Sequence, residues 1–132
     1  MAILQNLSNF LLYFAVALAL FGLFAIIYLR LTPYAELKLI RQGNLAAAVA
    51  LLGAMLGFAL PLASCIANSV SLQDMVIWGV IALLVQALVY LAAARLLPEL
   101  KHSIANGQLA HGVFLGGLAL VVGLLNAACM VY

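Results

Sequence analysis

Two halves of this chain carry the same sequence pattern, and this duplication constrains the fold more than any other feature. Residues 41–68 and 105–132, aligned without a gap, are identical at 10 of 28 positions. The matches include a Gly-x-Leu-Ala segment near the start of each copy and a cysteine near its end. A general excess of apolar residues would not align both features in one register. We therefore expect two copies of one structural unit, with repeat one at residues 1–68 and repeat two at residues 69–132.

The composition indicates that lipid surrounds both copies. Hydrophobic residues make up 70% of the 132 residues and charged residues only 6%, whereas soluble domains carry about 25% charged residues. The few charges leave long uncharged stretches, and a helix needs about 20 apolar residues to cross the hydrocarbon core of a bilayer. The sequence predicts four membrane spans, at about residues 8–31, 45–67, 72–94 and 109–131.

The spans are expected to be helices. Lipid offers the backbone no hydrogen-bond partner, so only helices and closed barrels cross it, and a barrel would show alternating residues in place of continuous apolar runs. Each repeat then contains two antiparallel helices, and because that number is even, both copies point the same way. The predicted fold class is an all-α, four-helix integral membrane protein whose repeats are related by an axis along the membrane normal.

The positive charges predict the orientation of the protein in the membrane. All lysines and arginines fall in the two loops that follow spans one and three: Arg30, Lys38, Arg41, Arg95 and Lys101. Because cytoplasmic loops carry the excess of basic residues, both loops are expected in the cytoplasm and both termini outside. No cleavable signal pattern precedes span one, so we expect it to remain as an anchor.

Each basic loop is predicted to hold a short helix at the membrane surface. Pro33 and Pro98 break the preceding spans and suit the first turn of these helices, while Gly43 and Gly107 are placed to end them. On the outer side, the capping-box spacing of residues 71–74 is expected to start span three.

The first of these short helices is expected to be amphipathic. Residues 34–41 alternate apolar and polar side chains, which places Glu36 on a polar face with Lys38 and Arg41. The matching stretch of repeat two, which carries Glu99 and Lys101, alternates less clearly.

Small residues are spaced for close helix packing in spans two and four. Three residues separate Gly53 from Gly57 in one span, and Gly112 and Gly116 have the same spacing in the other. This pattern predicts helix–helix contact, within one chain or between subunits; a permeation path lined by bare backbone is the alternative. Because four helices cannot hide all of this small-residue surface, we also expect a homo-oligomer.

Few polar side chains lie within the spans. Gln86, near the middle of span three, is expected to bond a neighbouring helix, with substrate contact as the alternative. His111 and Asn126, near the two ends of span four, are weaker candidates for polar or substrate contact. Aromatic residues near the span ends are expected to face the membrane interfaces: Tyr13, Tyr28, Trp78 and Tyr90.

The two cysteines occupy equivalent positions near the outer ends of spans two and four. Cys65 and Cys129 allow three arrangements: two buried thiols, a disulfide that joins the repeats, or an intermolecular bond. A bond is chemically permitted there if the outer side faces an oxidising compartment. The spacing of histidines, cysteines and acids does not suggest a metal site.

The segment from Tyr34 to Ala48 reads Tyr-Ala-Glu-x6-Gly-Asn-x-Ala-Ala-Ala. With its degenerate second copy, the tandem two-span repeat and the short outer hairpin, the whole chain resembles the YjfL-type family of uncharacterised bacterial inner-membrane proteins. The resemblance implies a small four-span protein of the cytoplasmic membrane and supplies no mechanism or catalytic residue. His111 replaces Ala47 in the second copy, so the two halves are not expected to function identically.

The remaining function classes are non-enzymatic. The chain has no nucleophile motif, phosphate-binding glycine loop or paired carboxylates, so we expect no enzyme activity and no cofactor. Topology explains the five basic residues, so nucleic-acid binding is not expected. The first hypothesis is a membrane scaffold or accessory subunit that docks a cytoplasmic or membrane protein through its basic loops. The alternative is a small oligomeric channel or transporter.

Overall fold

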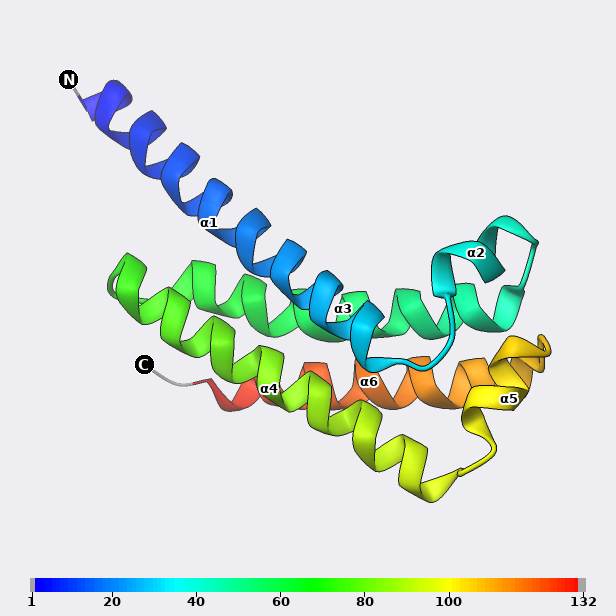
Figure 1. The fold of residues 1–132 in the computed structure, drawn as a ribbon. Helices are drawn as coiled ribbons and strands as arrows, with labels where there is room; N and C mark the ends of the chain where they lie inside the picture. The colour runs from blue at the N-terminus through cyan, green and yellow to red at the C-terminus, as the bar shows by residue number, and fades with distance from the viewer. Residues whose placement is uncertain (1, 131–132) are drawn as a thin grey trace.

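The computed structural model describes residues 2–130, which form six helices (Figure 1). They are α1 (Ala2–Leu31), α2 (Glu36–Arg41), α3 (Leu45–Asn68), α4 (Leu72–Leu96), α5 (Leu100–Ala105) and α6 (Leu109–Cys129). The four longest, α1, α3, α4 and α6, are long and apolar enough to cross a membrane. The predicted all-α fold with four spans is therefore confirmed.

The ends of the spans differ slightly from the predicted ones. Helix α1 begins at Ala2, not at residue 8, because its polar residues Gln5, Asn6 and Asn9 do not interrupt the backbone hydrogen bonds. Helix α4 continues to Leu96, just before Pro98. Helix α6 ends at Cys129, and the predicted last residue of span four, 131, lies outside the described residues.

The capping prediction for span three is confirmed, and so is the prediction that spans one and three end before Pro33 and Pro98. The prediction that these prolines open the short helices is wrong. Ser71 is the N-cap of α4 and its hydroxyl accepts a hydrogen bond from the Asp74 amide at 3.1 Å. Helices α2 and α5, in contrast, begin at Glu36 and Leu100, after the prolines have already redirected the chain. Pro33 therefore lies in the turn between helices, where its fixed φ still suits a tight reversal.

The same backbone motif ends both short helices. Gly43 and Gly107 have positive φ angles of 84° and 79°, in the left-handed region that glycine enters without steric cost. The following amides, of Asn44 and Gln108, each donate to a carbonyl five residues earlier at 2.9 Å, as in a Schellman motif. This motif turns the chain sharply into α3 and α6.

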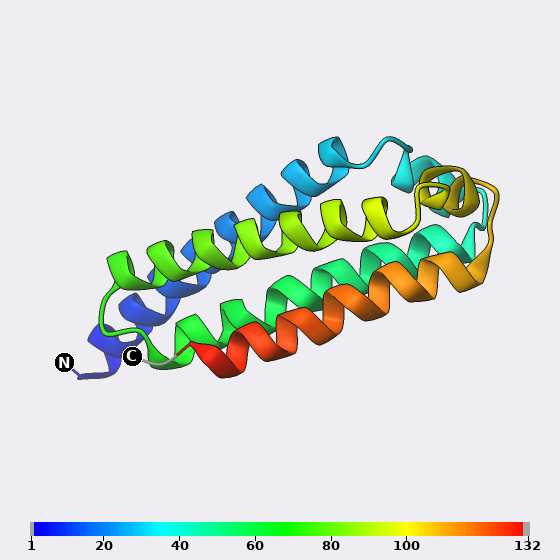
Figure 2. The ribbon, with the colours of Figure 1, turned by 90° about the horizontal axis from the view of Figure 1, so that it is seen from below.

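Helices α3 and α6 run parallel and form the tightest contact of the fold (Figure 2). A Cβ atom at Gly53 would overlap the backbone of Gly116, and one at Gly112 would overlap the backbone of Ala46. Gly57 likewise lies against the backbone of α6. The predicted packing glycines thus serve contacts within one chain, which uses up much of the small-residue surface on which the homo-oligomer prediction rested.

Gln86 connects three of the spans. It is 1% exposed, and its Nε2 donates to the Gly57 carbonyl at 3.0 Å and to the Ala119 carbonyl at 3.1 Å. Pro61 has no N–H, so the Gly57 carbonyl has no partner one turn later in α3. The amide of Gln86 satisfies this carbonyl and at the same time holds α4 against α3 and α6.

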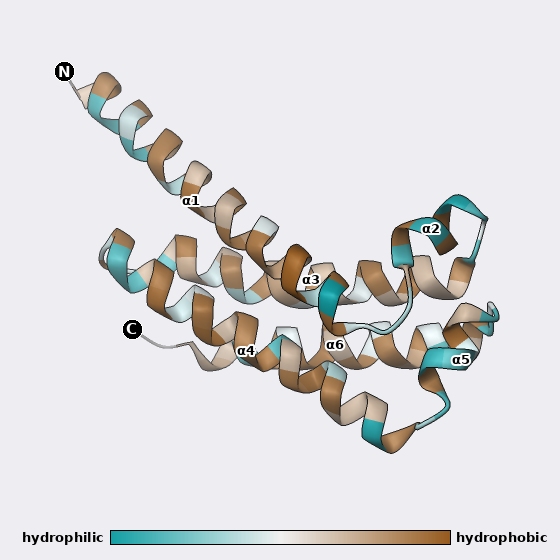
Figure 3. Cartoon of the chain, in the orientation of Figure 1, coloured by the Kyte–Doolittle hydropathy of each residue, from teal (hydrophilic) through white to brown (hydrophobic). Residues whose placement is uncertain are grey.

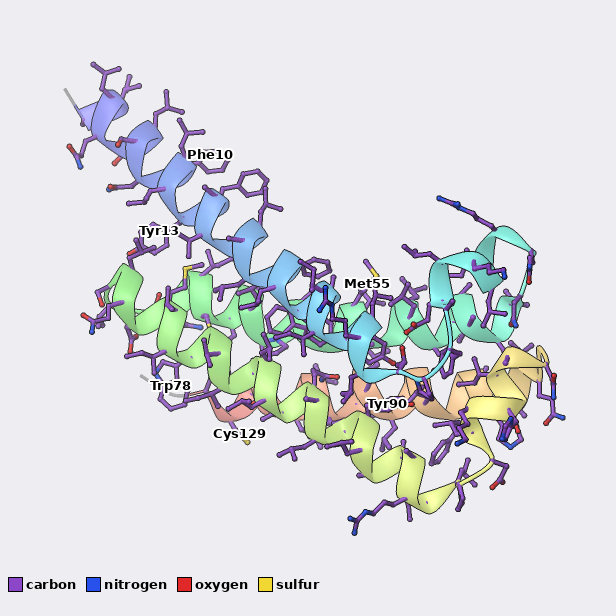
Figure 4. The ribbon with its side chains drawn as sticks, in the orientation of Figure 1. Phe10, Tyr13, Met55, Trp78, Tyr90 and Cys129 are labelled. Atoms are coloured by element: carbon purple, nitrogen blue, oxygen red, sulfur yellow. The ribbon has the colours of Figure 1, made fainter. Side chains whose placement is uncertain are left out.

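Helix α1 packs only along its second half. Its buried residues are Ala17, Leu20, Phe24 and Tyr28, and its first half leans away from the other helices (Figure 1). Phe10 and Tyr13, on this diverging part (Figure 4), help line an open groove of about 320 Å³ that reaches Ile66 at the end of α3. The core of the protein is therefore built from α3, α4 and α6, with α1 added at one side.

Candidate functional site

The positive charges gather at one end of the bundle. Hydrophilic residues colour α2, α5 and the nearby helix ends in Figure 3, while the spans are largely apolar. The basic side chains at this end are all exposed: Arg30, Lys38, Arg41, Arg95 and Lys101. The start of α1 and the end of α6 lie at the opposite end (Figure 2). We refer to the end that carries α2 and α5 as the basic end.

A buried carboxyl group lies beneath the basic end. Glu36 is 2% exposed, and its Oε1 accepts a hydrogen bond of 2.6 Å from the Thr32 hydroxyl. The prediction that Glu36 shares an exposed polar face with Lys38 and Arg41 is wrong, and Leu37 is the exposed residue instead. The reason is the turn at residues 32–35, which directs the first residue of α2 back toward the end of α1.

Three tyrosines lie near this carboxyl. Tyr28 and Tyr90 are 3% and 5% exposed, and their rings meet edge to face with centroids 5.9 Å apart. Tyr90 reaches from α4 toward the connection between α1 and α2 (Figure 4), where Tyr34 also interacts electrostatically with Glu36. The expectation that Tyr28 and Tyr90 face the membrane interface is therefore wrong, because both rings pack inside the bundle.

Several oxygen atoms of this group lack a hydrogen-bond partner. Glu36 Oε2, Tyr28 OH and Tyr34 OH each have less than 1 Å² of exposed surface and no partner among residues 2–130. Burial raises the pKa of the Glu36 carboxyl from 4.5 to about 7, although hydrogen bonds from Thr32 and from its own backbone favour the ionised form. Burial also raises the pKa of the Tyr34 phenol. The group can therefore hold a proton on Glu36 near neutral pH. We call these residues (Tyr28, Thr32, Tyr34, Glu36 and Tyr90) the Glu36 cluster.

The polar residues singled out in the sequence do not form one site. Gln86 lies in the interior of the bundle, and His111 and Asn126 lie about four helical turns apart on α6. His111 Nε2 is 3.8 Å from the carboxylate of Glu99, which is 55% exposed, so solvent screens this pair. Asn126 is partly buried and its amide nitrogen has no partner among the described residues.

The two cysteines have different surroundings. Cys65 is fully buried, and its sulfur lies 3.7 Å from the sulfur of Met130. Cys129 is exposed and points away from the bundle (Figure 4). Helices α3 and α6 contact each other along their lengths, but not through equivalent faces. The two equivalent cysteines therefore face in different directions.

The cluster is not arranged as a metal site. Within residues 2–130, no three His, Cys, Asp or Glu side chains gather to hold a metal ion. Glu36 is the single acid of its cluster, and the other oxygens are neutral phenols and a hydroxyl. Carboxylate-rich, multidentate oxygen sets are what divalent cations select, so the chemistry of this cluster favours a proton.

The sequence does not predict the Glu36 cluster, because its members are spread over α1, the connection that follows it, α2 and α4. One local signal was available. Thr32 and Glu36 are four residues apart on either side of Pro33, a spacing that brings both side chains to the inner side of a turn. The tyrosines gave no distinct signal, since Tyr28 and Tyr90 also have positions typical of interfacial aromatic residues.

Four apolar helices with short connections define a small multi-pass membrane protein with a basic end. The chain belongs to the family described as Domain of Unknown Function (DUF350), which it matches over residues 2–130. It is 41% identical over 132 residues to the UPF0719 inner membrane protein YjfL of Escherichia coli strain K12, with 100% of both chains covered. The protein of the same name from Escherichia coli O157:H7 is similar to the same extent. No solved structure matches the chain. The protein is therefore a multi-pass inner-membrane protein of this family.

Proposed function

We propose that this protein is a non-enzymatic scaffold or accessory subunit that docks an acidic protein segment through its basic end. The observation that carries the proposal is the exposure of all five lysines and arginines at that end. Glu99 is the exposed acid nearby, so the surface keeps a strong positive excess. Such a surface attracts anionic partners at long range.

The packing of the bundle supports a scaffold over a pore through one chain. Helices α3 and α6 touch backbone to backbone at Gly53 and Gly57, which leaves no space between them for a permeating ion. The Gln86 amide is committed to two carbonyls of these helices. The polar groups in the interior thus serve to hold the helices together.

A small oligomeric transporter is the second candidate, and one observation favours it. Proton-coupled transporters use ionisable groups at membrane depth or in protein-lined cavities. Glu36 is a buried carboxyl at the edge of the spans and provides such a group. We expect flux in proteoliposomes to be lost in Glu36→Gln and kept in Glu99→Gln if this candidate is correct.

The proposed orientation places the basic end in the cytoplasm and both termini outside. Single cysteines introduced at Lys38 and at Gln73, in a Cys129→Ser background, sample the two ends of the bundle. In intact cells, we expect a membrane-impermeant maleimide to label the cysteine at position 73 and to leave position 38 unlabelled until the membrane is opened. The reverse pattern would contradict the orientation.

Charge reversal tests the docking surface. A photo-crosslinking residue at Lys101 is expected to capture a protein in cells, and the double change Lys38→Glu with Arg41→Glu is expected to reduce this capture at least about tenfold, since like charges repel across an interface. The matched control, Lys38→Arg with Arg41→Lys, keeps both charges and should retain capture. Equal capture by both double variants, or capture of this chain and lipid alone, would contradict docking of an acidic partner.

A further inference from the structure

We propose that the Glu36 cluster is a proton-binding site, in which the Glu36 carboxyl takes up one proton from solvent at the basic end. The Thr32 hydroxyl donates a hydrogen bond to one carboxyl oxygen, and the other oxygen is buried without a hydrogen-bond partner. This inference is independent of the proposed docking function, because it concerns the chemical state of one carboxyl group.

The packing around Glu36 disfavours the carboxylate. Oε1 accepts the short hydrogen bond from Thr32, but Oε2 has no partner and less than 1 Å² of exposed surface. Because Oε2 has almost no exposed surface, solvent stabilises a charge on it poorly, and burying an ionised carboxylate without compensating partners is costly. A proton is the one species that can neutralise Oε2 without repacking the side chains. The phenol oxygens of Tyr28 and Tyr34 are equally enclosed, so the whole cluster is suited to a neutral acid.

The neighbouring elements bring no cation to this carboxyl. Tyr28 of α1 and Thr32, which directly follows α1, lie near it, and Arg30 of α1 is exposed. From α4 it faces Tyr90, while Arg95 is exposed.

The connection between α1 and α2 contributes Tyr34. Helix α3, which packs against α2, has no titratable side chain between residues 45 and 64. Lys38 and Arg41 of α2 itself are exposed. Among residues 2–130, no basic nitrogen lies within ion-pair distance of Glu36.

The direction of the pH effect follows from the raised pKa of Glu36. Because the folded protein holds the proton more tightly than an unfolded chain, the packed cluster is favoured at low pH. It loses stability as the pH rises from the ordinary carboxyl range toward about 7 and changes little above that value. Ionisation of Glu36 should therefore loosen the first turn of α2.

The chain is well suited to a direct measurement, because it contains only two glutamates, Glu36 and Glu99. In protein labelled with 13C at the glutamate carboxyl and reconstituted in lipid nanodiscs, the Glu99→Gln variant leaves Glu36 as the single labelled carboxyl. We expect its carboxyl resonance to titrate with a midpoint near 7. In the matched Glu36→Gln variant, the transition with a midpoint near 7 should be absent.

Thr32 provides a second test within the same cluster. Replacing Thr32 by valine removes the hydrogen bond that favours the carboxylate, so the Glu36 midpoint should rise further, by about one pH unit. Thr32→Ser keeps the hydroxyl and should leave the Glu36 midpoint unchanged. This variant also provides a folded control if valine is not tolerated. A Glu36 midpoint in the ordinary carboxyl range, or a carboxylate signal at every pH, would overturn the proposal.

Discussion

Gly53→Val is expected to destabilise the protein more than any other single change considered for this chain, by about 3 kcal/mol or more. The added side chain would overlap the backbone of Gly116, and backbone atoms of a packed helix cannot move aside as a flexible side chain can. Helices α3 and α6 would have to separate along their closest contact. The free energy of unfolding in lipid or mild detergent, followed by circular dichroism or steric trapping, measures this effect.

Gly117→Val is the matched control for this prediction. Gly117 occupies the position of repeat two that is equivalent to Gly53, yet a Cβ atom there would meet nothing within 4 Å. The same substitution should therefore change the free energy of unfolding by only about 0.5 kcal/mol. Similar losses in both variants would mean that general helix propensity, and not the α3–α6 contact, determines the result.

Gln86→Leu is expected to lower the free energy of unfolding by about 1–3 kcal/mol, since it leaves the Gly57 carbonyl buried without a partner. Leucine is apolar and similar in size, so the loss should come mainly from the missing hydrogen bonds to α3 and α6. Thermal unfolding of the variant in lipid, compared with the unchanged protein, measures the loss.

Pro61→Ala tests whether the unpaired Gly57 carbonyl causes the stability loss in Gln86→Leu. Alanine restores an N–H at position 61, which can donate to the Gly57 carbonyl within α3. In this background, Gln86→Leu should cost about 1 kcal/mol less than it does alone, and a double-mutant cycle isolates that coupling. If the two changes were simply additive, the amide of Gln86 would not be compensating for the proline.

The overall fold could be predicted from the sequence because it depends on local properties. Uncharged apolar runs determine where helices cross lipid. Ser71 starts α4 and Gly107 ends α5, each through contacts with its immediate neighbours. These signals need no knowledge of the other helices. The sequence places the start of α1 too late in the chain, because polar residues such as Gln5 lower the local hydropathy without breaking a helix.

The candidate site could not be predicted in the same way, because it depends on contacts between distant segments. Glu36 appeared to be a surface residue from the alternation of its neighbours, but the turn before α2 reverses which side of the helix is buried. Tyr28 and Tyr90 are 62 residues apart, and only the folded chain brings their rings together and places both near the carboxyl. A single sequence contains no measure of such pairings.

Similarly, the glycine spacing predicted close packing but did not identify the partner helix. The parallel pairing of α3 with α6 brings Gly53 against Gly116 and leaves Gly117 open. Two related sequence copies thus contact each other through different faces. The equivalence of the repeats in sequence does not extend to the contacts that each one makes.

The parallel pairing of α3 and α6 also bears on how the protein is made. Asn44, at the start of α3, donates a hydrogen bond to the carbonyl of Ile104, 60 residues later in the chain. While the ribosome is still producing α4 to α6, the glycine face of α3 has no partner helix and is exposed to lipid. The α3–α6 contact therefore forms only after α6 has been made, and a nascent chain that stalls before α6 would present an unfilled surface to membrane chaperones and proteases.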